Sequence, residues 1–536
     1  MRRLVSAATA AALLGTGLAA LGGTAAAAPA AQQAPTAAPT AGFKPKPIDW
    51  GRCDSKTLRQ AKARCGMLTV PLDYAKPKGR KIRLAVSRIA HTTPDRKAQG
   101  PMLVNPGGPG GSGLIYSIMQ SWVPDKGGAP YDWIGFDPRG VGDSTPTISC
   151  DGDVLAPGTR PAYVPESQAD IDDWLERSAA YAQACADNNG KILRHDDTRT
   201  WIKDMESLRK ALREKKISFY GFSYGTYLGS AYATAYPKRV HRMVFDGVVQ
   251  PSRVWYGGNL DQEVQFDENV DVFFDWVAEN DAAYGLGTDG DAVRAVYYDV
   301  LQQLTDDPLP EFGAADWNDV FVGAGYYVYG WDELAHVLAA AADGDLGPAR
   351  AYYGDPTGPG ADASWAAYLA TECTDAPWPS DWSVWQEDAE QMHASAPFLA
   401  WNNTWFNAPC LTWPAPAGKP MKISGSKAPP ILLVAETNDA ATPFAGALEV
   451  RSLFPRSVLI EGVGGTTHSG SLSGVGCTDT KIARYLKTGR LPARQAGDRS
   501  DVRCAPVPPP SATPSGEKRL TLRERLHREV VAANVR

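Results

Sequence analysis

The chain has 536 residues, of which 43% are hydrophobic and 21% are charged, and its formal net charge is −6. This length exceeds what one simple core needs, which favours a large catalytic domain with an inserted or appended domain. The charge is mildly negative and forms no basic stripe, so nucleic acid is not an expected partner.

The N-terminus has the pattern of a secretory signal peptide, which we place at residues 1–28. Two arginines follow the initiator methionine, residues 4–21 are apolar and rich in Ala and Leu, and residues 25–28 are alanines. The apolar run is only weakly hydrophobic, which favours cleavage over a stable membrane anchor. Residues 29–45 have the composition of a disordered segment or a propeptide. We therefore expect a secreted, extracellular protein.

Eight cysteines follow the signal region, and an even count in an exported chain indicates disulfides. Spacing alone does not fix their connectivity, and pairing of sequence neighbours is the simplest arrangement. We predict Cys53–Cys65, Cys150–Cys185, Cys373–Cys410 and Cys477–Cys504. No C-x-x-C or H-x-x-x-H spacing is present, so we expect no metal site and no cofactor.

Strand and helix patterns alternate over residues 46–250, which predicts a mostly parallel sheet with crossover helices. The predicted strands are 65–71, 81–87, 101–104, 131–136, 216–220 and 240–245, and the predicted helices are 200–213 and 226–236.

The alternation stops at residue 251. Residues 251–425 contain helical, Trp- and Tyr-rich stretches such as 270–280 and 331–341. Strand patterns resume at 430–435 and 457–460, so residues 426–505 complete the core. This order predicts an α/β fold with a mostly helical cap domain inserted late in the sheet. A Pro-rich and charged tail, 506–536, follows and receives no role.

Ser223 lies in the pentapeptide Gly-Phe-Ser-Tyr-Gly, between a predicted strand and a predicted helix. In that position G-x-S-x-G is the nucleophile elbow of the α/β-hydrolase fold, and the two glycines avoid clashes in a sharp turn. The alternative is an ordinary serine in a Gly-rich turn. The strand–turn–helix context favours the nucleophile.

A serine hydroxyl needs a base to take its proton, usually a histidine oriented by a carboxylate. The chain has seven histidines. His468 follows the last predicted strand, where a loop can hold the imidazole over the elbow, and it is the predicted base. His241 and His336 lie in a strand and a helix and are expected to be structural, and His393 is a weaker competitor in the cap.

The acid of this fold follows the serine and precedes the histidine in the chain. Asp439 is the predicted acid, because it lies in the loop after strand 430–435 and beside a Thr-Pro that can fix the turn. Glu436, nearer the strand, is the reserve. Asp246, after strand 240–245, is a third option, with loop capping as its structural alternative.

The Gly-rich run 107–113 follows the strand that supplies an oxyanion donor in this fold. Tyr224, directly after the nucleophile, is expected to give the second backbone N–H. A phosphate-binding loop is the competing interpretation. It fails because the run lacks a Gly-Lys-Ser/Thr ending and because Pro109 has no amide hydrogen.

Together, these features resemble the proline iminopeptidase-like branch of α/β-hydrolases, and within it the secreted bacterial tripeptidyl aminopeptidases. The resemblance covers most of residues 45–505. It rests on the stretches 105–113 (NPGGPGGSG), 135–142 (GFDPRGVG), 220–226 (YGFSYGT), 373–375 (CTD) and 439–443 (DAATP).

The resemblance implies a serine exopeptidase in which Ser223 is the nucleophile, Asp439 the acid and His468 the base. It implies that Gly107 is the oxyanion glycine, with Gly108 as a near alternative. One residue departs from the wider branch: Pro106 stands where proline iminopeptidases carry a histidine, so the role of that histidine cannot be transferred.

An exopeptidase must recognise a free N-terminal ammonium, and a buried carboxylate in the cap would do so. Glu372 and Asp375, on either side of Cys373, are the first candidates, and Glu263 and Glu268 are others. The alternative for each is a solvated surface acid.

The predicted function is therefore release of tripeptides from unblocked peptides, with peptides that carry a free N-terminus as the partners. An esterase or lipase of the same fold is the alternative, since only the cap would differ. A binding module without activity is a third hypothesis, against which the apparent triad argues.

Overall fold

One mixed sheet forms the centre of the fold. In the computed structural model, which describes residues 43–513, ten strands lie in the order β1-β2-β3-β5-β4-β6-β7-β8-β9-β10. β1, β2, β3 and β5 pair antiparallel, and every pair from β5 through β4 to β10 is parallel. The prediction of a mostly parallel α/β sheet is confirmed.

The strands are β1 (Gly51–Arg52), β2 (Arg64–Pro71), β3 (Lys81–Ile89), β4 (Pro101–Asn105), β5 (Asp132–Phe136), β6 (Ile217–Phe222), β7 (Val240–Asp246), β8 (Leu432–Glu436), β9 (Val458–Gly462) and β10 (Val502–Cys504). The predicted signal peptide, residues 29–42 of the next segment and residues 514–536 of the tail lie outside the described residues.

Both faces of the sheet are covered, because the side chains of β4 to β9 alternate between two apolar clusters. In β4, Leu103 belongs to one cluster, and Met102 and Val104 belong to the other. The Leu103 cluster includes residues of α3 (Thr198–Ala211), α4 (Tyr224–Ala235) and α14 (Phe444–Leu453). The second includes residues of the 3₁₀ helix η2 (Leu114–Ser121) and of α15 (Gly476–Thr488). A short helix, α1 (Lys56–Gln60), precedes β2.

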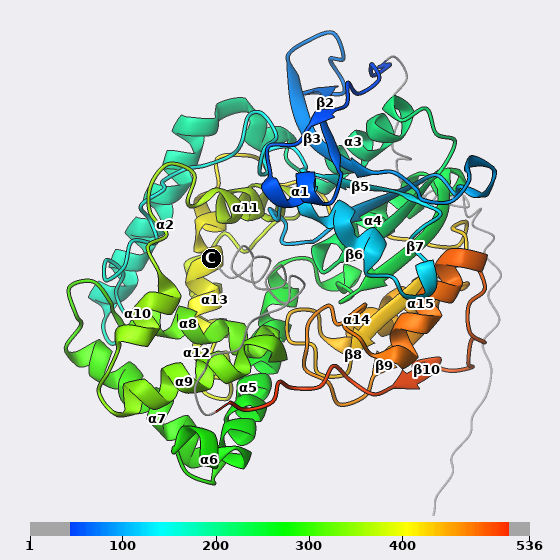
Figure 1. The fold of residues 1–536 in the computed structure, drawn as a ribbon. Helices are drawn as coiled ribbons and strands as arrows, with labels where there is room; N and C mark the ends of the chain where they lie inside the picture. The colour runs from blue at the N-terminus through cyan, green and yellow to red at the C-terminus, as the bar shows by residue number, and fades with distance from the viewer. Residues whose placement is uncertain (1–42, 514–536) are drawn as a thin grey trace, which may run out of the picture. The chain divides into compact units, whose positions relative to one another are not determined.

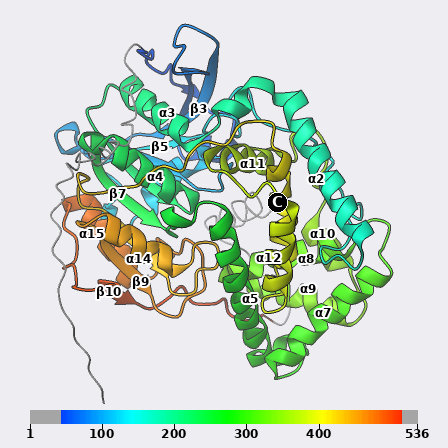
Figure 2. The ribbon, with the colours of Figure 1, turned by 180° about the vertical axis from the view of Figure 1, so that it is seen from behind.

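The segment between β7 and β8 carries helices, of which α5 to α10 share an apolar core of their own, whereas α11 packs into the Leu103 cluster. Phe273, Tyr297, Trp317 and Trp331 are among the buried aromatic residues of the α5 to α10 core. Figures 1 and 2 show α5 to α10 gathered beside the sheet. Within residues 43–513, no helix has both the length and the apolar character that crossing a bilayer requires. The helices are α5 (Tyr256–Glu279), α6 (Asp281–Tyr284), α7 (Gly290–Asp306), α8 (Ala314–Tyr326), α9 (Trp331–Ala342), α10 (Gly347–Tyr353), α11 (Ala363–Asp375), α12 (Trp382–His393) and α13 (Ala400–Asn407).

One further helix, α2 (Gln168–Asn189), lies between β5 and α3 in the chain but packs against the late helical segment. It contacts the 3₁₀ helix η8 (Ala408–Thr412). The ring of Trp174 stacks on Trp405 with centroids 5.5 Å apart. In Figures 1 and 2, α2 runs along the outer side of the cap helices.

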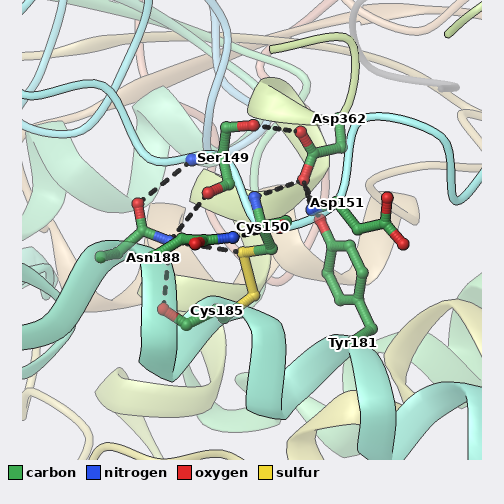
Figure 3. Close-up of a disulfide and its surroundings, with 8 residues drawn as sticks. Ser149, Cys150, Asp151, Tyr181, Cys185, Asn188 and Asp362 are labelled. Carbon is green, nitrogen blue, oxygen red and sulfur yellow. Dashed lines mark hydrogen bonds between the residues drawn. A yellow bond between two sulfur atoms is a disulfide. The ribbon is translucent and has the colours of Figure 1, made fainter. Parts of the chain in front are cut away.

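All four disulfides form between the predicted cysteine neighbours. The Cys150–Cys185 bridge ties the loop after β5 to α2, and Figure 3 shows its surroundings. Asp362, directly before α11, accepts hydrogen bonds from the Ser149 hydroxyl (2.6 Å), the backbone N–H groups of Cys150 (2.6 Å) and Asp151 (3.0 Å), and the Tyr181 hydroxyl (2.7 Å). One carboxylate therefore joins α11 to this disulfide and to α2.

We predict that Asp362→Ala lowers the free energy of unfolding by about 3 kcal/mol, because buried donors lose their acceptor. Asp355→Ala is the matched control: Asp355 is exposed and accepts a hydrogen bond from Thr357 on its own loop. Its change should stay within about 0.5 kcal/mol. Chemical denaturation with the disulfides intact measures both variants, and equal effects would contradict the bracing role of Asp362.

Candidate active site

Ser223 occupies a strained turn between β6 and α4. Its backbone has φ 53° and ψ −129°, a conformation that residues with a side chain rarely adopt, and its N–H donates to the Asp246 carbonyl at 3.0 Å. The flanking glycines have no room for a side chain. A Cβ on Gly221 would lie 2.5 Å from the Gly225 carbonyl oxygen, and one on Gly225 would lie 2.7 Å from the Asn105 carbonyl oxygen. This is the geometry of a nucleophile elbow.

The imidazole of His468 is held by a buried carboxylate and a hydroxyl. His468 Nδ1 lies 2.8 Å from Asp439 Oδ1 and 2.9 Å from Oδ2. Thr442 donates to the same carboxylate through its N–H and its hydroxyl, each at 2.9 Å. The Thr442 hydroxyl also lies 3.3 Å from His468 Nδ1. The Thr-Pro after Asp439 thus fixes the acid, as expected from the sequence.

The two other carboxylates near this site bind backbone rather than the imidazole. Glu436 accepts the N–H groups of Thr467 (2.8 Å) and Val507 (2.7 Å), and Asp246 accepts the N–H of Ser471 (2.8 Å). Burial raises the pKa of Glu436 to about 8 and the pKa of Asp246 to about 7. Among the described residues, Asp439 is the carboxylate in contact with His468, so the geometry favours it as the acid.

The loop that carries His468 is docked on the cap. The His468 N–H donates to the Tyr326 carbonyl at the end of α8 (2.8 Å), and the rings of Tyr326 and Tyr327 lie 5.8 and 6.1 Å from the imidazole. The Asn269 amide of α5 donates to the Gly325 carbonyl (3.1 Å) and the Thr466 carbonyl (3.3 Å). Cap backbone therefore fixes the position of the candidate base.

The Gly-rich loop passes directly beside the elbow. A Cβ on Gly107 would lie 2.7 Å from Ser223 Cβ and 3.2 Å from the Tyr224 nitrogen, so only glycine fits there. The Gly107 N–H donates to the Asn105 side chain at 3.2 Å. Gly108 lines the cavity at the elbow, as do Ser223 and Tyr224. The geometry therefore favours Gly108 over Gly107 as the partner of Tyr224 in an oxyanion hole.

Ser223 and His468 line one cavity, of about 150 Å³, between the elbow and the cap helices. Apolar and amide side chains that the sequence did not single out share its wall, including those of Asn259, Phe266, Tyr326, Tyr368, Asn402 and Asn403. The richness of the cap in aromatic residues was visible in the sequence, but nothing in it showed which of them face the serine.

Glu372 also lines this cavity, and it is buried. Its Oε2 has no hydrogen-bond partner within residues 43–513. Burial raises the pKa of Glu372 well above its usual value, although Tyr368 and Asn259 lower it by hydrogen bonding. A buried carboxylate with a free oxygen is suited to a cationic group that enters the cavity.

The other acidic candidates do not line this cavity. Asp375 accepts the N–H and the hydroxyl of Thr198. Glu263 is buried and accepts the Asn403 amide at 3.2 Å, and its Oε2 also has no hydrogen-bond partner within residues 43–513. Glu268 is exposed and accepts the Gln265 amide at 2.7 Å. Of the four acidic residues, Glu372 alone shares the cavity with Ser223. Within residues 43–513, no cluster of His, Cys, Asp or Glu could hold a metal ion.

Comparison with known proteins finds relatives that match most of the chain. Residues 396–504 match the family described as "TAP-like protein". The tripeptidyl aminopeptidase of Streptomyces lividans is 39% identical over 86% of this chain and 87% of its own. The serine protease Hip1 of Mycobacterium tuberculosis is 30% identical over 83% of this chain and 90% of its own. Carboxylesterase B of the same organism is 31% identical over 85% of this chain and 90% of its own.

We predict that Asp439→Asn slows the reaction of Ser223 with a fluorophosphonate by about 10³–10⁴-fold, because the imidazole loses its correct tautomer and orientation. The measurement is the rate of covalent labelling, followed by intact mass. Asp355→Asn, a change at an exposed carboxylate, should label at the unchanged rate. Unchanged labelling of Asp439→Asn would remove Asp439 from the triad.

Proposed function

We propose that this chain, which belongs to the tripeptidyl aminopeptidase family of α/β-hydrolases, releases tripeptides from unblocked peptide N-termini through an acyl-enzyme on Ser223. It is a serine hydrolase of the aminopeptidase type, and its relatives carry that activity in their names. One observation carries the finer proposal: the buried Glu372, with a free carboxylate oxygen, lines the same cavity as Ser223 and His468.

In the proposed reaction, His468 takes the hydroxyl proton as Ser223 attacks the carbonyl carbon of the scissile bond. Negative charge develops on the carbonyl oxygen, and the N–H groups of Gly108 and Tyr224 stabilise it. His468 then gives the proton to the leaving amine, and water attacks the acyl-enzyme by the reverse sequence. Asp439 holds the imidazole and stabilises its charged form.

Glu372 is the proposed anchor for the substrate ammonium. An ammonium beside a buried carboxylate forms a charge-assisted hydrogen bond, whereas an acetylated N-terminus leaves the carboxylate buried without a cation. Burial is the main cause that raises the pKa of the Tyr326 hydroxyl, and the negative charges of Asp439 and Glu372 raise it further. Glu372, Ser223 and His468 line the same cavity, so the proposed anchor and the nucleophile face one bound peptide.

We also propose that the protein is exported from the cell. Four disulfides close loops within the described residues, and disulfides persist in oxidising compartments. With the N-terminal signal pattern, they support a secreted enzyme.

An esterase is the second candidate, because one relative is a carboxylesterase B and the same triad would cleave an ester. The cap decides between the two candidates. An esterase has no use for a buried carboxylate anchor, whereas an aminopeptidase depends on one.

We predict that wild-type enzyme releases tripeptides from a free peptide and leaves its N-acetylated copy intact. Glu372→Gln should lower kcat/KM for the free peptide by at least about 100-fold, the effect expected when a buried charge pair is lost. It should change hydrolysis of a small nitrophenyl ester less than about threefold. Ser223→Ala should abolish both activities, by about 10⁴-fold or more. Mass spectrometry of the products tests this, and cleavage of the acetylated peptide would contradict the aminopeptidase assignment.

The pH dependence should report on the same carboxylate. Because burial raises the pKa of Glu372, the carboxyl is protonated in acid and must release a proton to pair with an ammonium. The ratio of kcat/KM for the free peptide to that for the ester should therefore rise with pH, by up to about tenfold per unit. It should stop rising at the lower of two pKa values, that of Glu372 or that of the peptide amine, ~7.7–8.0.

The same triad cleaves the peptide and the ester. Protonation of the base therefore changes both rates equally and does not change their ratio. In Glu372→Gln the ratio should be independent of pH. A ratio that rises equally in both proteins would show that another group binds the amine.

A further inference from the structure

A second cavity, of about 430 Å³, opens beside the catalytic cavity, and we call it the annexe. It lies between α2, α11, α13 and the loop after β5, and aromatic rings form much of its wall. The two cavities share five wall residues, Leu155, Arg160, Tyr163, Trp365 and Phe406. The triad and Glu372 do not line the annexe, so the reaction described above assigns it no role.

Helix α11 runs from one cavity to the other. Glu372 and Tyr368 line the catalytic cavity alone, whereas Trp365 lines both cavities. These positions are spaced at about one helical turn and so share one face of the helix. The seven residue steps from Trp365 to Glu372 correspond to about 10 Å along the helix axis. Three residues of extended peptide span about the same length.

The Gly-rich loop meets α11 at the Trp365 end. A Cβ on Gly110 would lie 2.3 Å from the Ser364 carbonyl oxygen, so the loop and the helix are in direct contact there. A peptide with its ammonium at Glu372 and its third carbonyl at the Gly-rich loop therefore runs from Glu372 toward Trp365. Beyond the scissile bond, the same direction leads into the annexe.

We propose that the annexe binds the polypeptide on the C-terminal side of the scissile bond, before that polypeptide leaves. This inference rests on the proposed function and adds a binding site to it. Arg160 supports it at the junction of the cavities. Its guanidinium is buried and anchored by Asp316 and Asp319, yet its Nε–H has no hydrogen-bond partner among the described residues. A peptide carbonyl that crosses the junction supplies the missing acceptor.

The mouth of the annexe carries negative charge. Asp151 and Asp153 are exposed there, and the one cation at the described rim, Arg177, is paired with Asp173 at 3.0 Å. The expected occupant is therefore a peptide with apolar residues just after the scissile bond and with Lys or Arg farther on.

The test is a substitution at an exposed position that places a large side chain in the annexe. Ala180 of α2 is exposed and lines the annexe, so Ala180→Trp places a large ring in its mouth. Ala179, the next residue along the same helix, is exposed but lines neither cavity, and Ala179→Trp is the matched control. Each protein is assayed on a tripeptidyl nitroanilide and on a decapeptide with the same first three residues.

Ala180→Trp should lower kcat/KM for the decapeptide at least about tenfold and change that for the anilide less than about twofold, and Ala179→Trp should change neither. Equal loss on both substrates, or no loss on the decapeptide, would overturn the inference. If wild-type enzyme cleaves neither substrate, the proposed function itself fails.

A second measurement needs no variant. For wild-type enzyme, kcat/KM should rise as the peptide is lengthened from one to four residues beyond the scissile bond, and it should rise more when the last of these is Lys. Equal rates at all lengths would overturn the inference even if Ala180→Trp did not fold.

Discussion

The contact between the cap and the two loops that follow β8 and β9 is the constraint on which the site depends. The Tyr326 carbonyl accepts the His468 N–H, and the Gln262 amide donates to the Ala441 carbonyl at 2.7 Å. Ala440 and Ala441, directly after Asp439, are buried in the apolar core of the cap. The loop bearing the candidate acid is therefore part of the cap core and the loop bearing the candidate base is hydrogen-bonded to the cap, so a change in cap packing moves the imidazole as well as the substrate cavity.

Three buried carboxylates lie within this small region, and their surroundings give them different roles. Asp439 faces the His468 imidazole and accepts the hydroxyl and the N–H of Thr442. Glu436 accepts the Thr467 N–H and Asp246 binds Ser471 through its N–H and its hydroxyl, and burial raises the pKa of each carboxyl. With raised pKa values, these two carboxyls carry less negative charge beside Asp439 than ordinary carboxyls would. They also hold the base loop at Thr467 and Ser471, on either side of His468.

The features that sequence predicted are those encoded within a few residues. The turn around Ser223 and the disulfides between neighbouring cysteines follow from local spacing, and the structure has both. The structure also places Asp439 beside Thr442 and His468, and its role as the acid stays a prediction. The packing of α2 on the cap could not be predicted. It depends on a ring stack between Trp174 and Trp405, more than 200 positions apart, for which the sequence holds no local signal. For the same reason, the sequence could not show which of Glu372 and Asp375 lines the cavity, because that depends on how α11 packs.

The chemistry of the triad does not distinguish an aminopeptidase from an esterase, so in the proposed function the distinction comes from Glu372 and from how firmly α11 holds it. This helix carries Glu372 and is fixed at both ends. Asp362 binds the Cys150–Cys185 region at its start, and the Cys373–Cys410 disulfide anchors the residue after Glu372. An ammonium site selects for a free N-terminus at a set distance only if its carboxylate cannot follow a misplaced substrate. Two disulfides and a fully bonded carboxylate supply that stiffness, which the hydrolysis of a simple ester would not require.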